Sequence, residues 1–475
     1  MVTYQDFLKI KETGNEEKIQ QYLLTIINTY KTSDAYKTAC TAYDYMRGQN
    51  VTIKERIHKL ITKTGQEKVD IWSPNNKTAT SIFKRFIYME CQYLLSNGIR
   101  WEKEETVNKL GKMFDNTVRQ TAKLALSEGV AFLALRNNRK GEFDPMAMSL
   151  RNFAPLYDEQ NGALRAGIYF YQIDDLHPTT IILFEEDGYT GYLQNIDSTI
   201  AQLEAKQTYI RNMTVDGISG ERIYDGENYP TFPVIPYYGN SLHQSELIPL
   251  RDKIDAYDRI QNDYIDRLED TQFYWIIRNA GGMDDNEEIA RFLDQLKAMR
   301  AASLSDGSEF SPVEVHVPYQ ESETILSRLE RALYKDAMMT DVENIAGGAV
   351  TATQIEAAYT PLKIKASELE ECTLNFLNAV CEALGIDDSP VLTPDVLLNK
   401  SEEISNVNNS YGAGTISREY ATERILTING DIDKLDEVLM QMDATDMQRI
   451  SGIGITDTEE QQEEANDEIN NTDRP

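Results

Sequence analysis

The sequence lacks the short motifs that mark the commonest enzyme sites. A phosphate-binding loop needs G-x-x-x-x-G-K-[ST], yet the one Gly-Lys pair, Gly111-Lys112, is followed by Met113. Neither the G-x-S-x-G turn of serine hydrolases nor the H-E-x-x-H helix of zinc peptidases occurs. These absences exclude phosphate-loop ATPases and two large classes of hydrolase.

Histidine and cysteine, the usual metal ligands and nucleophiles, are scarce and widely spaced. The chain holds four histidines and four cysteines, with no C-x-x-C pair. Carboxylates are abundant, so a two-metal nuclease built from pairs such as Asp284-Asp285 and Asp387-Asp388 stays open as the enzymatic alternative. Otherwise we expect no catalytic residue, no metal site and no cofactor. The scarce residues are His58, His177, His243, His316, Cys40, Cys91, Cys372 and Cys381.

Basic charge and long apolar runs are also in short supply. The chain has 47 Lys and Arg against 78 Asp and Glu, and its net charge of -31 opposes a surface that grips nucleic-acid phosphates. No run approaches the roughly 18 apolar residues of a membrane helix, and Met1 to Ile10 has no apolar signal-peptide core. We expect no membrane partner. The acidity suits an ordinary soluble protein, and equally a channel wall that passes DNA without holding it.

The periodicity of the apolar residues changes along the chain. Residues 1 to about 125 are predicted to be mainly helical, including Asn15 to Tyr30 and Asn75 to Ser96. Between Val130 and Tyr238, short strand-like runs alternate with turn clusters such as Asp187-Gly188. The pattern predicts a helix-rich α+β body with a meandering sheet.

Two long helices with a narrow apolar seam come after this body. The first is predicted from Glu246 to about Arg278. This range contains no glycine, and its one proline, Pro249, falls in the first turn, where proline is tolerated. An insertion, Asn279 to Gln320, separates it from a second helix, Glu321 to about Val342. A narrow seam with charge on the other faces is typical of a helix packed against neighbours, and we expect the pair to run antiparallel. The seam residues are Leu250, Ile254, Tyr257, Tyr264, Leu268, Leu329 and Leu333.

Small residues come after the second helix, in the stretch Asn344-Ile345-Ala346-Gly347-Gly348-Ala349-Val350-Thr351. Its two adjacent glycines permit either a moving loop or an ordinary turn between helices. Another helix is expected over Ala352 to Leu384, broken or kinked at Pro361. Val396 to Met447 is predicted to be mostly helical, and the acidic stretch Asp457 to Pro475 to be disordered.

Five segments occur in an order and spacing known from one family. They are YDYMRGQNVTI (Tyr43 to Ile53), IFKRFIYMECQYLLSNGI (Ile82 to Ile99), ALSEGVAFLAL (Ala125 to Leu135), APLYDEQNGALRAGI (Ala154 to Ile168), and FPVIPYYGN with the helix after it (Phe232 to Asp270). Together they resemble the portal (head-to-tail connector) proteins of tailed bacteriophages, in particular long-tailed phages of Gram-positive hosts. The resemblance spans about Tyr43 to Ile386. It departs at Gly239, where many relatives carry a polar residue, and at Gly347-Gly348, where they often show Ser-Gly.

The resemblance implies a portal fold and a division of the chain into named parts. These are a wing (1–245), a first stem helix (246–278), a clip (279–320), a second stem helix (321–341), a tunnel loop (342–352), a helix returning to the wing (353–388), a helical crown (389–456) and the acidic tail (457–475). The tunnel loop would be the part that faces DNA, through Asn344, Ile345, Ala346, Gly347, Gly348, Ala349, Val350 and Thr351.

The resemblance also implies partners and a location. About twelve copies would form a closed ring around a channel for double-stranded DNA, bound without sequence preference. The terminase large subunit and head-completion or adaptor proteins would dock on the ring, which would also contact the major capsid and scaffolding proteins. The protein would then reside at the portal vertex of the virion, and in the host cytoplasm during assembly. A non-enzymatic helical adaptor or scaffold of a phage particle is the alternative, because the apolar seam suits either.

Overall fold

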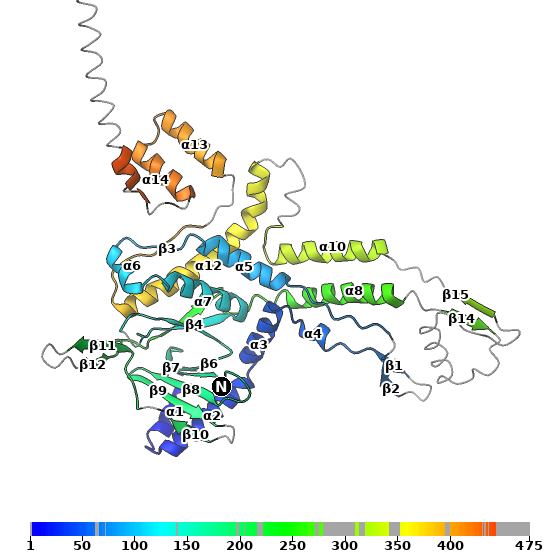
Figure 1. The fold of residues 1–475 in the computed structure, drawn as a ribbon, viewed down its shortest axis with the longest axis horizontal. Helices are drawn as coiled ribbons and strands as arrows, with labels where there is room; N and C mark the ends of the chain where they lie inside the picture. Colours follow the sequence, from blue (N-terminus) through cyan, green and yellow to red (C-terminus); the bar gives the residue numbers. More distant parts are fainter. Residues whose placement is uncertain are drawn as a thin grey trace, which may run out of the picture. The chain divides into compact units, whose positions relative to one another are not determined.

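The computed structural model divides into two compact units, Met1–Val342 with Tyr359–Pro394 and Glu343–Ala358 with Asp395–Pro475 (Figure 1). The structure describes residues 2–61, 66–71, 73–138, 141–195, 199–203, 205–215, 222–270, 275–278, 309–312, 319–341, 352–394, 400–429, 431, 434–435 and 437–442. The expected tunnel loop, except Ala352, and the acidic tail lie outside these residues, as does most of the expected clip.

The first unit begins with helices that start where their capping residues predict. Asn15 and Ser33 each accept a hydrogen bond from a backbone N–H in the first turn of the helix after them. The apolar face predicted over Asn15 to Tyr30 is buried, and Leu23 lies at its centre. These helices are α1 (Tyr4–Lys11), α2 (Glu16–Lys31), α3 (Asp34–Met46) and α4 (Val51–Lys54).

Three more helices follow, and one of them packs directly on a sheet. The first is α5 (Ile82–Leu95), which ends just before Asn97-Gly98 as predicted, with Gly98 at a φ of 76°. It contacts α7 (Phe114–Glu128), and α7 packs on strands β4 and β5. The short helix α6 (Glu104–Leu110) lies between them in the chain.

The predicted meander is a five-stranded antiparallel sheet of order β10-β9-β8-β7-β6. Gly167 in β7 is needed there, because a Cβ would lie 2.0 Å from the ring of Phe153 on β6. A three-stranded sheet of order β13-β4-β5 packs beside α7. The strands are β4 (Val130–Ala134), β5 (Met146–Ser149), β6 (Phe153–Tyr157), β7 (Leu164–Tyr171), β8 (Thr179–Glu185), β9 (Gly188–Gln194), β10 (Ile200–Gln202) and β13 (Val234–Tyr238).

Four further antiparallel pairs of short strands complete the described sheets. They join β1 (Lys59–Ile61) to β2 (Glu67–Val69), β11 (Ile210–Val215) to β12 (Arg222–Glu227), β16 (Val391–Leu392) to β3 (Ile99–Arg100), and β14 (Trp275–Arg278) to β15 (Glu309–Pro312).

Helix α12 (Ala352–Leu384) joins the three-stranded sheet through one buried tyrosine. The ring of Tyr237 stacks on Phe376 with centroids 4.6 Å apart, and its hydroxyl lies 2.6 Å from the hydroxyl of Thr373. Of the two outcomes predicted at Pro361, a break or a kink, the break does not occur, because the helix continues across that residue. In the second unit, α13 (Lys400–Gly412) precedes α14 (Arg418–Asn429), which Ser417 caps as its position predicts.

The two long helices are shorter than predicted. The first, α8 (Arg251–Asp270), gives way to strand β14, so a helix running to Arg278 is wrong; Trp275 and its isoleucine neighbours favour strands, and periodicity alone does not separate a short apolar strand from a helix end. The second, α10 (Tyr319–Asp336), ends before Val342 because Met338 adopts a φ of 55°.

Candidate functional site

Helices α8 and α10 pack side by side and run antiparallel (Figure 1). Lys253 near the start of α8 forms an ion pair with Asp336 at the end of α10, which sets their relative height. We call this pair of helices the stem.

The seam residues predicted from sequence lie along the stem, but they are not equally covered. Leu250, Ile254 and Leu333 are buried at the end near the Lys253–Asp336 pair. Tyr257, Tyr264 and Leu329 are half-buried, and Leu268 at the far end is 44% exposed. The stem is therefore tightly packed at one end, whereas its far end leaves apolar surface uncovered.

Helix α8 presents three distinct faces, because successive residues are turned by about 100°. One face packs on α10. A second face carries the buried polar residues Asp258, Asn262 and Asp266, spaced four apart. The third face carries exposed charges, which include Asp252 and Arg259.

The second face of α8 holds an extended segment, residues 74–80, by hydrogen bonds to its backbone. Asp258 accepts from the N–H of Thr80 at 3.0 Å, and Asp266 accepts from the N–H of Asn76 at 2.8 Å. Between them, Asn262 accepts from the N–H of Thr78 and donates to its carbonyl oxygen, both at 2.8 Å. We call this set of contacts the polar ladder.

The polar ladder works because two repeats nearly coincide. Residues four apart on an α-helix rise by about 6 Å, and alternate residues of an extended chain are about 6.6–6.8 Å apart. Three rungs can therefore form in succession, at Asn76, Thr78 and Thr80. The side chains of α8 replace the neighbouring strand that such a segment would otherwise need.

The two carboxylates of the ladder, Asp258 and Asp266, also have partners outside the extended segment. Burial raises the pKa of Asp258, and hydrogen bonds from Asn50 and Thr80 oppose that rise. Arg56 forms ion pairs with Asp263 and Asp266, the second at 3.4 Å. The segment between Lys54 and Lys59 is thus tied to the same helix.

A second polar cluster joins the base of the stem to the rest of the first unit. The ammonium group of Lys365, on α12, lies 3.1 Å from Glu90 Oε2 on α5 and 2.7 Å from Glu246 Oε2 just before α8. The same group donates to the carbonyl oxygen of Ala337, just after α10, at 3.3 Å. One buried cation therefore bridges four segments, and we call this cluster the Lys365 junction.

Burial and charge act in opposite directions at the Lys365 junction. Burial raises the pKa of Glu90 to about 7, although Lys365 partly offsets the rise. Burial acts to lower the pKa of Lys365, but Glu90 and Glu246 together outweigh it and raise that pKa. The lysine therefore stays charged, while Glu90 titrates near neutral pH.

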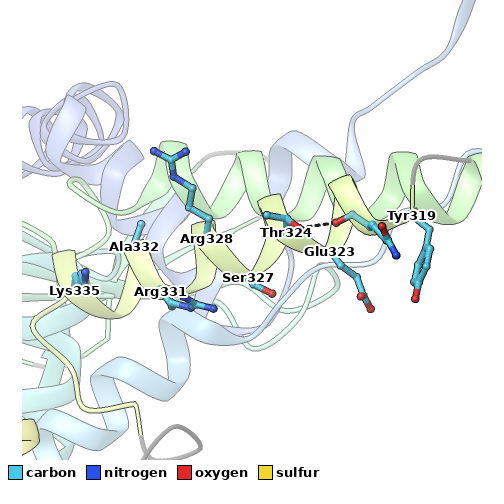
Figure 2. Close-up of a pocket in the computed structure, with 9 residues that line it drawn as sticks. Tyr319, Glu323, Thr324, Ser327, Arg328, Arg331, Ala332 and Lys335 are labelled. Atoms are coloured by element: carbon cyan, nitrogen blue, oxygen red, sulfur yellow. Dashed lines mark hydrogen bonds between the residues drawn. The ribbon is translucent and has the colours of Figure 1, made fainter.

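The outer face of α10, turned away from α8, borders a groove of about 900 Å³ (Figure 2). Arg328, Arg331 and Lys335 are exposed on this face, and none has an ion-pair partner in the part of the chain that the structure describes. The groove is lined by Tyr319, Gln320, Glu323, Thr324, Ser327, Arg328, Arg331, Ala332 and Lys335.

Sequence reasoning missed both polar clusters. The signal for the ladder was available as the spacing Asp258-x-x-x-Asn262-x-x-x-Asp266 on one helical face. No comparable signal marks the Lys365 junction, because its members are far apart in the sequence. Within the described ranges, no group of three or more His, Cys, Asp or Glu is placed to hold a metal ion, and no helix is long and apolar enough to cross a membrane.

Comparison with known proteins gives one family and several distant structures. The family model described as "Phage portal protein, SPP1 Gp6-like" matches residues 25–471. The portal protein of Bacillus phage SPP1 is 25% identical over 340 residues, which are 69% of this chain and 65% of that protein. The portal protein of Clostridium phage phiCD119 is 24% identical over 205 residues, 40% of this chain and 45% of that protein. The matches thus span less than two thirds of either relative.

The solved structures that resemble this chain are more distant. A chain in the neck of the native gene transfer agent particle, computed with C12 symmetry, has a TM-score of 0.40 at 13% identity and covers 72% of this chain and 89% of that one. An HK97 family phage portal protein from Corynebacterium diphtheriae has a TM-score of 0.37 at 12% identity, covering 66% and 93%.

Replacing the central rung of the ladder tests its contribution to stability. Asn262→Leu leaves the N–H and carbonyl of Thr78 without partners, and we expect the free energy of unfolding in urea to fall by about 2–4 kcal/mol. Amide hydrogen exchange at Thr78 should accelerate as well. Asn116→Leu, at an exposed site on α7, is the control and should change stability by less than about 0.5 kcal/mol. Equal effects of the two variants would contradict the ladder.

The Lys365 junction predicts how stability depends on pH. A carboxyl group whose pKa is higher in the folded state than its ordinary 4.5 adds stability at low pH, and loses it as the pH rises towards the folded value of about 7. The lost contact with Lys365 lowers the stability of Glu90→Gln at every pH. As the pH rises from 5 to 8, however, we expect the variant to gain stability relative to the wild type, measured by urea unfolding. Glu371→Gln, at an exposed position on α12, should show no such gain. A pH-independent difference between Glu90→Gln and the wild type would overturn the assignment.

Proposed function

Because the chain belongs to the SPP1 Gp6-like family of phage portal proteins, we propose that it forms a ring of about twelve subunits at one capsid vertex. Double-stranded DNA would be packaged through the central channel by the terminase and ejected through it later. The ring would also connect the head to the tail. In this role the chain is a structural protein of the virion without a catalytic site, assembled in the host cytoplasm.

The observation that carries this proposal is the incomplete covering of the stem. The third face of α8 and the outer face of α10 are exposed, and apolar Leu268, Ile325 and Tyr319 are 44%, 46% and 52% exposed. A pair of helices this exposed is suited to contacts with neighbouring copies, and a ring supplies a neighbour on each side through heterologous, closing contacts. The polar ladder and the Lys365 junction use the other surfaces of the stem, and both make contacts within the subunit.

The remaining parts of the chain take the roles that the family suggests. Residues 279–320 would form the clip, on which the terminase large subunit and later the head-completion or adaptor proteins dock. Residues 342–352 would form the tunnel loop, and residues 389–456 the crown. Major capsid and scaffolding proteins would contact the assembled ring. With a net charge of -31, we expect DNA contacts to be weak and independent of sequence.

Native mass and electron microscopy test the ring directly. We expect purified protein to elute far above its 54.1 kDa subunit mass, and the same peak to show rings of about twelve subunits with a central hole in negative stain. A species that stays at 54.1 kDa even at high concentration would contradict the ring and favour a helical adaptor.

The tunnel-loop proposal is tested by stiffening the two adjacent glycines. Changing both Gly347 and Gly348 to proline removes the backbone freedom that a moving loop needs. We expect rings of normal mass that fail to package DNA in a reconstituted packaging reaction. Changing both to alanine is the milder control and should retain part of the activity. Normal packaging by the double proline variant would rule out this role for the loop.

A further inference from the structure

Two neighbouring residues on each stem helix carry opposite charges in mirrored order. They are Asp252-Lys253 on α8 and Lys335-Asp336 on α10. Lys253 and Asp336 pair with each other inside the subunit. Asp252 and Lys335 are exposed, and the described part of the chain gives neither an ion-pair partner. Beside the Lys253–Asp336 pair, the stem therefore carries two opposite charges that have no ion-pair partner among the described residues, and their heights along the stem differ by about 3 Å.

The two unpaired charges point away from the stem on opposite sides. Asp252 lies two residues from Ile254, whose side chain is 1% exposed, and Lys335 lies two residues from Leu333, which is 0% exposed. Two residues correspond to about 200° around a helix, so each charge faces nearly opposite to the buried seam. Figure 2 shows Lys335 at one end of the outer face of α10, on the side away from α8.

We propose that Asp252 of one subunit forms an ion pair with Lys335 of the next subunit around the ring. The inference rests on the proposed ring, in which rotation about the axis leaves every residue at its own height. Asp252 and Lys335 are each one residue from the Lys253–Asp336 pair, so on antiparallel helices their heights differ by about 3 Å, which the length of the lysine side chain can span between subunits. The third face of α8 then fills the groove along the outer face of the neighbouring α10.

Charge supports a second copy of this chain as the occupant of that groove. The groove carries Arg328, Arg331 and Lys335 without ion-pair partners in the described residues, whereas the chain as a whole has a net charge of -31. Of the exposed charges on the third face of α8, Asp252 is complementary to this basic face and Arg259 is not, so the charge argument rests on Asp252. DNA is another anionic partner that could bind this face. Exchanging the charges of Asp252 and Lys335 distinguishes DNA from a second copy of this chain.

A simpler explanation of the two charges is also testable. Asp252 lies in the first turn of α8 and Lys335 in the last turn of α10, where the helix dipoles favour a negative and a positive charge. In that case each reversal would lower the stability of the subunit, and the two losses would add in the double variant. An ion pair between subunits instead predicts that the second reversal repairs the first.

The test is a charge exchange in the full-length chain. At low ionic strength we expect Lys335→Glu and Asp252→Lys each to raise the protein concentration at half assembly by about tenfold, measured by native mass. The double variant should return close to the wild-type concentration. Added salt should shrink all of these differences. Lys18→Glu, at an exposed position on α2, is the control and should assemble like the wild type.

Each outcome supports or overturns a definite statement. If the wild type forms rings and neither single reversal changes the concentration at half assembly, the Asp252–Lys335 pair is overturned and the ring stands. A double variant that assembles no better than the worse single variant has the same consequence. Intact rings that lose affinity for DNA on Lys335→Glu would assign the groove to DNA and overturn the pair. Wild-type protein that never assembles would overturn the ring and the pair together.

Discussion

The match between the rise of helix α8 and the repeat of the extended segment 74–80 is the constraint on which the stem depends. Three side chains of α8 satisfy the backbone N–H groups of Asn76, Thr78 and Thr80, so the segment needs no neighbouring strand. Because buried N–H groups without partners cost free energy, the segment is held in one register along the helix. That register occupies the second face of α8, since α10 takes the first. The third face, which includes Asp252 and Arg259, is thereby left exposed.

The Lys365 junction complements the ladder at the base of the stem. A buried ammonium group with two carboxylates and one helix-end carbonyl would be costly if any partner were removed. Its members come from α5, α12 and the two ends of the stem, so the base of the stem cannot separate from α5 and α12 without leaving a charge exposed or unpaired. Rigid anchoring at this end contrasts with the other end, where the apolar side chains of Leu268 and Ile325 are exposed.

Much of the fold follows from local sequence signals, and the differences have identifiable causes. The helices over Asn15 to Tyr30 and Asn75 to Ser96 and the meander between Val130 and Tyr238 were predictable, because each is amphipathic and bounded by capping or turn residues. The helix predicted to Arg278 is wrong, because Trp275 and its neighbours continue the apolar pattern as a strand. The positive φ of Met338 ends α10 early. The sequence does not predict this φ, because glycine is the residue expected there and Met338 is not one.

The polar contacts that fix the stem were harder to predict than its apolar seam. Asp258, Asn262 and Asp266 resemble an ordinary solvated helix face until the extended segment is placed against them. Lys365, Glu90 and Glu246 are separated by more than a hundred residues along the chain in each pairing, so only the tertiary fold brings them together. Residues 344–351, expected to face DNA, lie outside the described residues, and their role stays a prediction.

Cross-linking tests most directly whether the two exposed sides of the stem meet between subunits. The chain would carry Asp252→Cys and Lys335→Cys and be treated with a short bifunctional thiol reagent. We expect a ladder of covalent oligomers on a denaturing gel, absent from either single variant and therefore independent of the four native cysteines, all of which are free. If the double variant assembles into rings but gives only monomer on the denaturing gel, a contact between these two sides is contradicted.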